Sequence, residues 1–171
     1  NNMPSLQIYI TFGLSASCNS IEPFVDVPSF LSLYNSIKQS ADNAVYILGG
    51  GSNSIFTKDF DGTVLVNEIK GISHFDTESH HYLRVGAGEN WHEFVSYCMN
   101  NSLYGYENLA LIPGSVGAAP IQNIGAYGVE LAQFLVEIEV LDRERDAVRN
   151  FSRAECEFGY RDSVFKQQSS H

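Results

Sequence analysis

A run of glycines followed by two hydrogen-bonding side chains is the first candidate binding segment of this sequence. It consists of Gly49, Gly50, Gly51, Ser52 and Asn53. Consecutive glycines can direct their backbone N–H groups toward one point and bind an anion such as a pyrophosphate. The segment lacks the Gly-Lys-Ser/Thr of a P-loop, and a G-x-G-x-x-G frame that starts at Gly49 ends at Ser54. A flexible hairpin is the alternative interpretation.

A second glycine-rich segment spans residues 113–128 and has four glycines and two prolines in sixteen residues, yet it is apolar. A surface loop with so many bends is ordinarily polar. Glycine is needed where φ is positive or where another group approaches the backbone closely. The segment therefore indicates either a backbone surface pressed against a large flat ligand or a tight buried connection between packed elements. Its spacing alone leaves both interpretations open.

Arg161 is the candidate for charge recognition. It lies between Tyr160 and Asp162, two residues after Gly159 and close to two phenylalanines. A fixed guanidinium can hold a carboxylate through two parallel hydrogen bonds. A salt-bridged surface arginine is the alternative interpretation.

The histidines and the possible nucleophiles give weaker signals. The five histidines are His74, His80, His81, His92 and His171. No pair has the spacing of a helical metal site with a third ligand nearby, so we expect no metal. The pair His80–His81 beside Asp76 and Glu78 is most simply a solvated loop, with metal binding as a minor alternative. No serine or cysteine stands in a nucleophile-elbow context, and covalent hydrolysis is unsupported.

Short apolar runs and helical spacing predict the elements that position these residues. The predicted strands are Phe24–Val27, Val45–Leu48, Thr63–Val66, Tyr82–Val85, Leu135–Leu141 and Val148–Phe151. Two helices are predicted, one capped by Ser29 and one capped by Asn90. Turns are expected at Asp61–Gly62 and over residues 142–146. Because strands and helices mix without a regular βαβ repeat, the sequence predicts an α+β fold, with a boundary near Gly71.

Composition limits the classes of partner. The chain has 171 residues, is 44% hydrophobic and carries a net charge of −10. This negative net charge disfavours nucleic acid or an anionic membrane as a general partner. It has no apolar run of about 18 residues and no basic-then-apolar segment at its start, so we expect neither a transmembrane helix nor a signal peptide. Three well-separated cysteines suit free thiols in a reducing cytoplasm.

Six blocks in register carry a resemblance to a known family. They are Thr11–Gly13, Leu48–Asn53, Gly86–Trp91, Gly105–Gly114, Pro120–Gly128, and Phe158–Ser163 with the following Phe165–Lys166. Over almost its whole length the chain resembles UDP-N-acetylenolpyruvoylglucosamine reductase, the MurB family of bacterial cell-wall synthesis. Any one glycine cluster would be weak evidence, whereas six blocks in the same order and spacing are strong evidence.

The resemblance implies the FAD-binding fold shared with vanillyl-alcohol oxidase and p-cresol methylhydroxylase, in which two subdomains, here 1–70 and 71–171, hold an extended FAD. The backbone of residues 49–53 would take the pyrophosphate. The residues expected to line the flavin and the rest of the cofactor are Pro113, Gly114, Gly117, Ala118, Ile121, Gly125, Ala126 and Tyr127. Backbone N–H groups can carry an anion without charged side chains.

The implied reaction belongs to peptidoglycan synthesis and is a hydride relay from NADPH through FAD to a small UDP-sugar, UDP-N-acetylenolpyruvoylglucosamine. Negative charge develops on the enolpyruvyl carboxylate and α-carbon, so electrostatic stabilisation should be a major contribution. Arg161 matches the catalytic arginine of the family. Tyr160 and Gln122 would line the substrate pocket.

The chain departs from the family pattern at its end. The family places a proton-donating serine in a Gly-Ser-Phe-Phe-type motif of a later substrate-binding domain, and an assisting glutamate near its C-terminus. Neither motif occurs among these 171 residues, and Ser163 and Ser170 lack that context. We therefore expect a cofactor-binding portion that is inactive alone. A different flavoenzyme of the same fold and a non-catalytic binding module are the competing hypotheses.

Overall fold

The structure is a computed structural model that describes residues 3–10, 15–39, 44–50, 52 and 54–168. Its α-helices are α1 (Val27–Lys38), α2 (Trp91–Asn100) and α3 (Val164–Gln168). Its strands are β1 (Cys18–Phe24), β2 (Ala44–Leu48), β3 (Phe60–Asn67), β4 (Ile72–Asp76), β5 (His81–Val85), β6 (Gly125–Ala126), β7 (Val129–Glu130), β8 (Glu137–Asp142) and β9 (Ala147–Ser152). Four short 3₁₀ helices cover Gln7–Tyr9, Glu107–Leu109, Val116–Ala118 and Leu131–Gln133. The predicted α+β class is confirmed.

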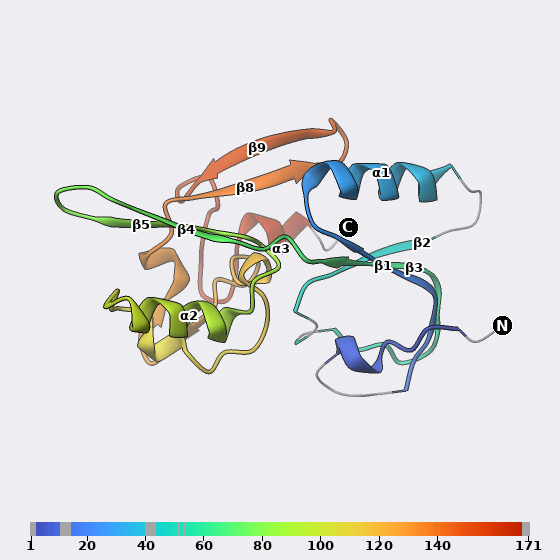
Figure 1. Cartoon of the computed structure of the whole chain (residues 1–171), viewed down its shortest axis with the longest axis horizontal. Coiled ribbons are helices and arrows are strands. Elements are labelled where there is room, and N and C mark those ends of the chain that lie inside the picture. Colours follow the sequence, from blue (N-terminus) through green and yellow to red (C-terminus); the bar gives the residue numbers. More distant parts are fainter. Residues whose placement is uncertain (1–2, 11–14, 40–43, 51, 53, 169–171) are drawn as a thin grey trace.

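The first 70 residues are built on a parallel three-stranded sheet with the order β1-β3-β2. The helix α1 lies over one face of the sheet, and the N-terminal segment lies on the other (Figure 1). Side chains alternate along a strand, so Val64 of β3 packs with Leu6 toward the N-terminal segment, while Leu65 packs with Phe30 of α1. Both faces of this sheet are thus covered.

The start of α1 differs from the sequence-based prediction. The preceding strand ends at Phe24 instead of Val27, and the N-cap is Asp26 instead of Ser29. The Asp26 carboxylate accepts a hydrogen bond from the Ser29 backbone N–H at 2.7 Å, and the Asp26 N–H donates back to Ser29 Oγ at 3.2 Å. This reciprocal capping box satisfies two N–H groups at once. Hydrogen bonds from the Ser29 side chain and the Ser29 backbone N–H to the carboxylate hold the pKa of Asp26 below its usual value.

The prediction of a turn at Asp61–Gly62 is also wrong, because both residues lie inside β3. A Cβ on Gly62 would lie 2.2 Å from the carbonyl oxygen of Ala44 on β2. This glycine therefore serves the close approach of two strands and not a change of direction. The strand β4, which pairs antiparallel with β5, is missing from the sequence-based prediction.

The second half is organised around α2, whose cap Asn90 and buried face agree with the prediction. The Asn90 side chain accepts from the Glu93 N–H at 3.0 Å. Trp91, Phe94, Val95 and Cys98 are all buried, and they form the centre of a core drawn from residues 72–135. The predicted hairpin after residue 135 is present as β8 and β9.

The three cysteines, Cys18, Cys98 and Cys156, are free and fully buried. Burial raises the pKa of the Cys98 thiol to about 11 and raises the pKa of the other two thiols as well. These thiols therefore pack as small apolar groups. Over the residues that the structure describes, no helix is long and apolar enough to cross a membrane.

Candidate functional site

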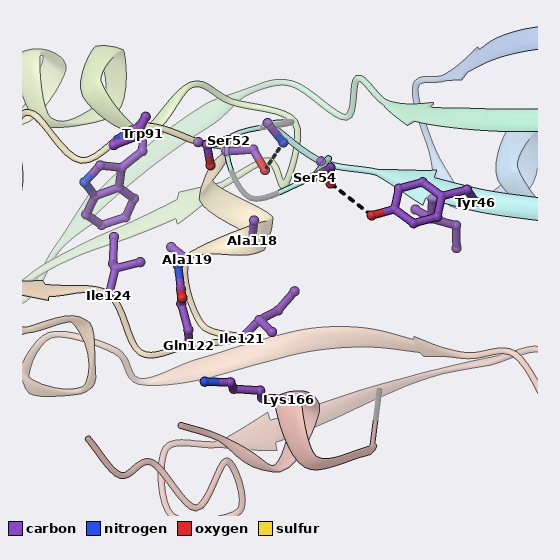
Figure 2. A pocket seen from close by; sticks show the side chains of 16 residues that line it. Tyr46, Ser52, Ser54, Trp91, Ala118, Ala119, Ile121, Gln122, Ile124 and Lys166 are labelled. Carbon is purple, nitrogen blue, oxygen red and sulfur yellow. Dashed lines mark hydrogen bonds between the residues drawn. The ribbon is translucent and has the colours of Figure 1, made fainter. Parts of the chain in front are cut away.

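A cavity of about 380 Å³ lies beyond the carboxyl end of β2 and joins the two glycine-rich segments. In open parallel sheets, ligands bind outside the carboxyl ends of the strands. The lining residues are Tyr46, Ile47, Gly49, Gly50, Ser52, Ser54, Trp91, Pro113, Gly114, Ser115, Ala118, Ala119, Ile121, Gln122, Ile124 and Lys166. Figure 2 shows Ser52 and Trp91 on one side of this first cavity and Lys166, from α3, on the other.

The two glycine-rich segments touch at Gly50. Its backbone N–H donates to Ser115 Oγ at 3.1 Å, across 65 residues of sequence. A Cβ on Gly50 would lie 2.4 Å from the Ser115 backbone nitrogen and 2.5 Å from the Gly114 carbonyl carbon. Real Cβ atoms do not come this close to backbone, so only glycine fits here. The first glycine segment is therefore anchored on the second at this residue.

Backbone hydrogen bonds fix the second segment against the start of α2. The Trp91 N–H donates to Gly114 O, the Val116 N–H donates to Glu89 O, and the Gly117 N–H donates to Ala87 O, each at 2.9 Å. A Cβ on Gly117 would lie 2.7 Å from the Ala87 side chain. This part of the segment is therefore held rigidly against the start of α2, and its opposite side faces the cavity.

The first cavity combines apolar and polar surface. Ala118, Ala119 and Ile121 form apolar lining on the second glycine segment. Hydroxyl groups line the opposite part, where Tyr46 Oη and Ser54 Oγ are hydrogen-bonded at 2.9 Å. Lys166 is the one charged residue among the lining residues. An apolar surface beside hydroxyls and a single cation suits an aromatic ligand that carries an anionic group.

A second cavity, of about 340 Å³, lies around Arg161. The lining residues are Gly125, Ala126, Tyr127, Gly128, Val129, Glu130, Gln133, Tyr160 and Arg161. Tyr160 and Arg161 form the tip of a tight turn, because Gly159 and Asp162 exchange backbone hydrogen bonds at 3.0 and 3.2 Å. Both side chains are exposed, so they are accessible to a ligand.

Arg161 is held at both its backbone and its side chain. Its guanidinium Nη2 donates to Gly125 O at 2.9 Å, and its own carbonyl accepts from Lys166 Nζ at 2.8 Å. Its φ of 54° lies in the left-handed region, as do those of Asn123 (42°) and Tyr127 (53°). Left-handed backbone is rare outside glycine and is retained where the surrounding structure enforces it, often at functional sites.

Asn123 connects the two sides of this second cavity. Its side chain is almost fully buried, with 1% exposure. The amide Nδ2 donates to Glu130 Oε2 at 2.9 Å and to Gly159 O at 3.0 Å, while Oδ1 accepts from the Ala132 N–H at 3.0 Å. Asn123 therefore ties the β6–β7 region to the Tyr160–Arg161 turn.

Replacing Asn123 by alanine should lower the free energy of unfolding by about 2–4 kcal/mol, because it removes three hydrogen bonds and leaves buried polar groups unpaired. Urea denaturation followed by circular dichroism measures the change. The matched control is the exposed Asn108, whose replacement by alanine should change stability by less than about 0.5 kcal/mol. Equal stability of the two variants would contradict this account of Asn123.

The structure distributes the predicted cofactor residues over both cavities. The residues that line the first cavity are Gly49, Gly50, Ser52, Pro113, Gly114, Ala118 and Ile121. Those that line the second are Gly125, Ala126 and Tyr127. Gly117 lines neither and packs on Ala87; Gly51 and Asn53 lie outside the described residues.

The predicted substrate-pocket residues are separated. Gln122 lines the first cavity, whereas Tyr160 lines the second together with Arg161. Ser163, which the sequence analysis set aside as a proton donor, is fully buried and donates from Oγ to Ile121 O at 2.6 Å. Its hydroxyl thus supports the second glycine segment.

Sequence reasoning missed Ser115, Asn123 and Lys166 as supports of the site. Ser115 and Asn123 are polar residues inside an apolar, glycine-rich segment, and that contrast is a signal that could have singled them out. Lys166 follows Arg161 by five residues, and this spacing gives no sign that its side chain reaches back to the Arg161 carbonyl.

A comparison with known protein families identifies the family to which this chain belongs. Residues 35–150, which include both glycine-rich segments, match the family model described as FAD binding domain. This chain belongs to that family. The α+β fold expected from the sequence is therefore the FAD-binding one.

Two relatives of this FAD-binding domain are reductases of the same name. The chain is 48% identical to the UDP-N-acetylenolpyruvoylglucosamine reductase of Pseudoalteromonas atlantica, with 96% of the chain and 47% of that protein covered. It is 48% identical to the enzyme of that name from Photorhabdus laumondii, with 97% and 48% covered. The resemblance found in the sequence is thus confirmed, and the chain spans about half the length of the curated relatives it matches.

A solved structure shows the same fold. The crystal structure of UDP-N-acetylenolpyruvylglucosamine reductase (MurB) from Thermus caldophilus superposes on the chain with a TM-score of 0.67 at 24% identity. The match covers 95% of this chain and 56% of the Thermus chain. The arrangement of elements is therefore shared over nearly the whole FAD-binding domain.

Proposed function

We propose that this chain is the FAD-binding portion of a UDP-N-acetylenolpyruvoylglucosamine reductase that uses NADPH and acts in peptidoglycan synthesis. The observation that carries the proposal is the pair of cavities along the second glycine segment. One cavity is apolar, with hydroxyls and a lysine, and the other presents Arg161 on a strained, fixed turn. The identity to reductases of this name supports the choice of reaction.

The residues of the first cavity fit FAD. Gly50 has no room for a Cβ because that position faces the backbone of Gly114 and Ser115, so the two glycine segments pack closely together beside the cavity. The segment 49–53 would hold the pyrophosphate, and Pro113, Gly114, Ala118 and Ile121 would contact the rest of the cofactor. When bound and reduced by hydride from NADPH, the flavin would supply the hydride that the substrate takes up.

The second cavity fits a carboxylate-bearing substrate. Arg161 would bind the enolpyruvyl carboxylate and stabilise the negative charge that develops on the substrate, a contribution that is largest where the donor is already oriented. Its hydrogen bond to Gly125 O and the support from Lys166 provide that orientation. Tyr160 would form the pocket beside it, and Gln122 would reach the substrate from the first cavity.

We further propose that the domain consists of two subdomains, 1–70 and 71–171. Two core clusters lie mainly within the first 70 residues, and the third is drawn from residues 72–135. The serine and glutamate that the family uses to complete the reaction have no counterpart in these residues, so we expect the chain alone to bind FAD without turnover. Cytoplasmic localisation is part of the same proposal.

Reconstitution with FAD tests the proposal. The purified chain is incubated with FAD and passed over a gel-filtration column, and the flavin absorbance of the protein peak is measured. We expect retained flavin but no oxidation of NADPH with the UDP-sugar. In the longer protein that contains this chain, the UDP-sugar should reoxidise the reduced flavin. Absence of flavin at saturating FAD would refute the cofactor assignment, whereas flavin reoxidised only by oxygen would favour an oxidase of the same fold.

A further inference from the structure

The β4–β5 hairpin gathers two histidines and an aspartate on one of its faces. In the antiparallel register, Asp76 is directly opposite His81, and His74 precedes Asp76 by two residues. Residues two apart on a strand, and residues directly opposite on neighbouring strands, point to the same face. The hairpin turn lies at the end farthest from α1 and the three-stranded sheet (Figure 1). No hairpin residue lines either cavity described above.

The three ligand atoms converge. Asp76 Oδ1 lies 2.6 Å from His74 Nε2 and 2.6 Å from His81 Nδ1, and the two imidazole nitrogens lie 3.4 Å apart. The His74 side chain is 25% exposed, while those of Asp76 and His81 are 57% and 62% exposed. The cluster is therefore open to solvent on one side and partly sheltered at His74.

The other face of the hairpin is aromatic and holds the remaining histidine. Phe75 and Tyr82 stack with their ring centroids 5.2 Å apart and their planes 8° apart. The His80 ring lies 6.0 Å from the Tyr82 ring. This stacked pair restrains the two strands. His80 is therefore directed away from the convergence point, although it is adjacent to His81 in sequence.

We propose that this face of the hairpin is a binding site for a borderline divalent metal ion of the Zn²⁺ class. His74 Nε2, His81 Nδ1 and Asp76 Oδ1 would be its protein ligands, and water would complete the coordination. Two imidazoles and a carboxylate suit Zn²⁺, Co²⁺ or Ni²⁺, whereas Ca²⁺ and Mg²⁺ require a shell of oxygens.

The geometry needs only a small adjustment to accept such an ion. With metal–ligand bonds near 2.1 Å in a tetrahedron, the ligand atoms are about 3.4 Å apart, which is the separation of the two imidazole nitrogens. The Asp76 oxygen must withdraw by about 0.8 Å from each, which rotation of an exposed side chain allows. The sequence predicts no metal here, with His80 and His81 beside Asp76 and Glu78 as a minor alternative, whereas the fold brings together His74, Asp76 and His81.

Titration of the tag-free chain with Zn²⁺ in an isothermal calorimeter tests the site. We expect one equivalent of Zn²⁺ to bind, with no saturable binding of Ca²⁺. His74→Ala, His81→Ala and Asp76→Asn should each weaken Zn²⁺ binding by about tenfold or more, since each removes one of three ligands. His80→Ala is the matched control, and its Zn²⁺ affinity should equal that of the unsubstituted chain. Titration with Co²⁺ should give the visible absorption of a tetrahedral ion, which His74→Ala abolishes.

Absence of saturable Zn²⁺ binding overturns the proposal, as do His74→Ala and His81→Ala variants that bind as tightly as the unsubstituted chain. A His80→Ala variant that loses as much affinity as they do shows that the ligand set is wrong. Because none of the substituted side chains is buried, circular dichroism should show unchanged folding. FAD retention of each variant is measured in parallel. Since the hairpin lies outside both cavities, the metal site and the proposed function succeed or fail independently.

Discussion

Replacing Arg161 by alanine in the full-length reductase proposed above should lower kcat by about 10²- to 10³-fold, with flavin content unchanged. Arg161 is proposed to stabilise charge that develops only as the substrate reacts, so its loss affects turnover more than FAD retention. It lines the second cavity and not the first. Stopped-flow measurement of flavin reoxidation by the UDP-sugar, together with the flavin absorbance of the purified variant, separates the two effects.

Two further variants define what the side chain does. Arg161→Lys keeps the positive charge but loses two-point binding of a carboxylate, so it should recover only part of the lost rate. Arg84→Ala is the matched control, because Arg84 is an exposed arginine whose partner is Glu139 on β8; its kcat should stay within about twofold, as exposed ion pairs contribute little. Wild-type kcat in Arg161→Ala would show that Arg161 is structural.

Replacing Gly50 by alanine should weaken FAD binding by about ten- to a hundredfold. The added Cβ would lie 2.4 Å from the Ser115 nitrogen and 2.5 Å from the Gly114 carbonyl carbon. Neither backbone atom can rotate away, so one of the two glycine segments must move. Overpacking of this kind costs about 1–3 kcal/mol, and about 1.4 kcal/mol corresponds to tenfold in affinity. Quenching of flavin fluorescence during titration of the chain with FAD measures the effect.

The matched control is Gly159→Ala. A Cβ at Gly159 meets only the Asp162 side chain, at 3.8 Å, which is an ordinary contact. FAD affinity of this variant should equal that of the unsubstituted chain, and its thermal midpoint should change little. Normal FAD affinity of Gly50→Ala would mean that the contact between the glycine segments does not shape the cofactor site.

Much of the fold follows from local sequence because the decisive interactions are close along the chain. The helix α2 needs a cap at Asn90 and apolar residues at positions 91, 94, 95 and 98, and both are visible in the sequence. The β8–β9 hairpin needs alternation and a charged turn. The errors at the start of α1 arose where several nearby residues compete for one role: Asp26 and Ser29 both can cap a helix, and they share the cap.

The sequence by itself determined the class of the fold, the glycine segments and the family resemblance, since these depend on residue type and spacing. Only the tertiary structure decided which residues meet. The contact of Gly50 with Ser115 spans 65 residues, and Asn123 reaches Gly159 across 36. The convergence of His74, Asp76 and His81 depends on a strand pairing that was not predicted. Such contacts are set by how the elements pack and by strand register, and a single sequence records neither directly.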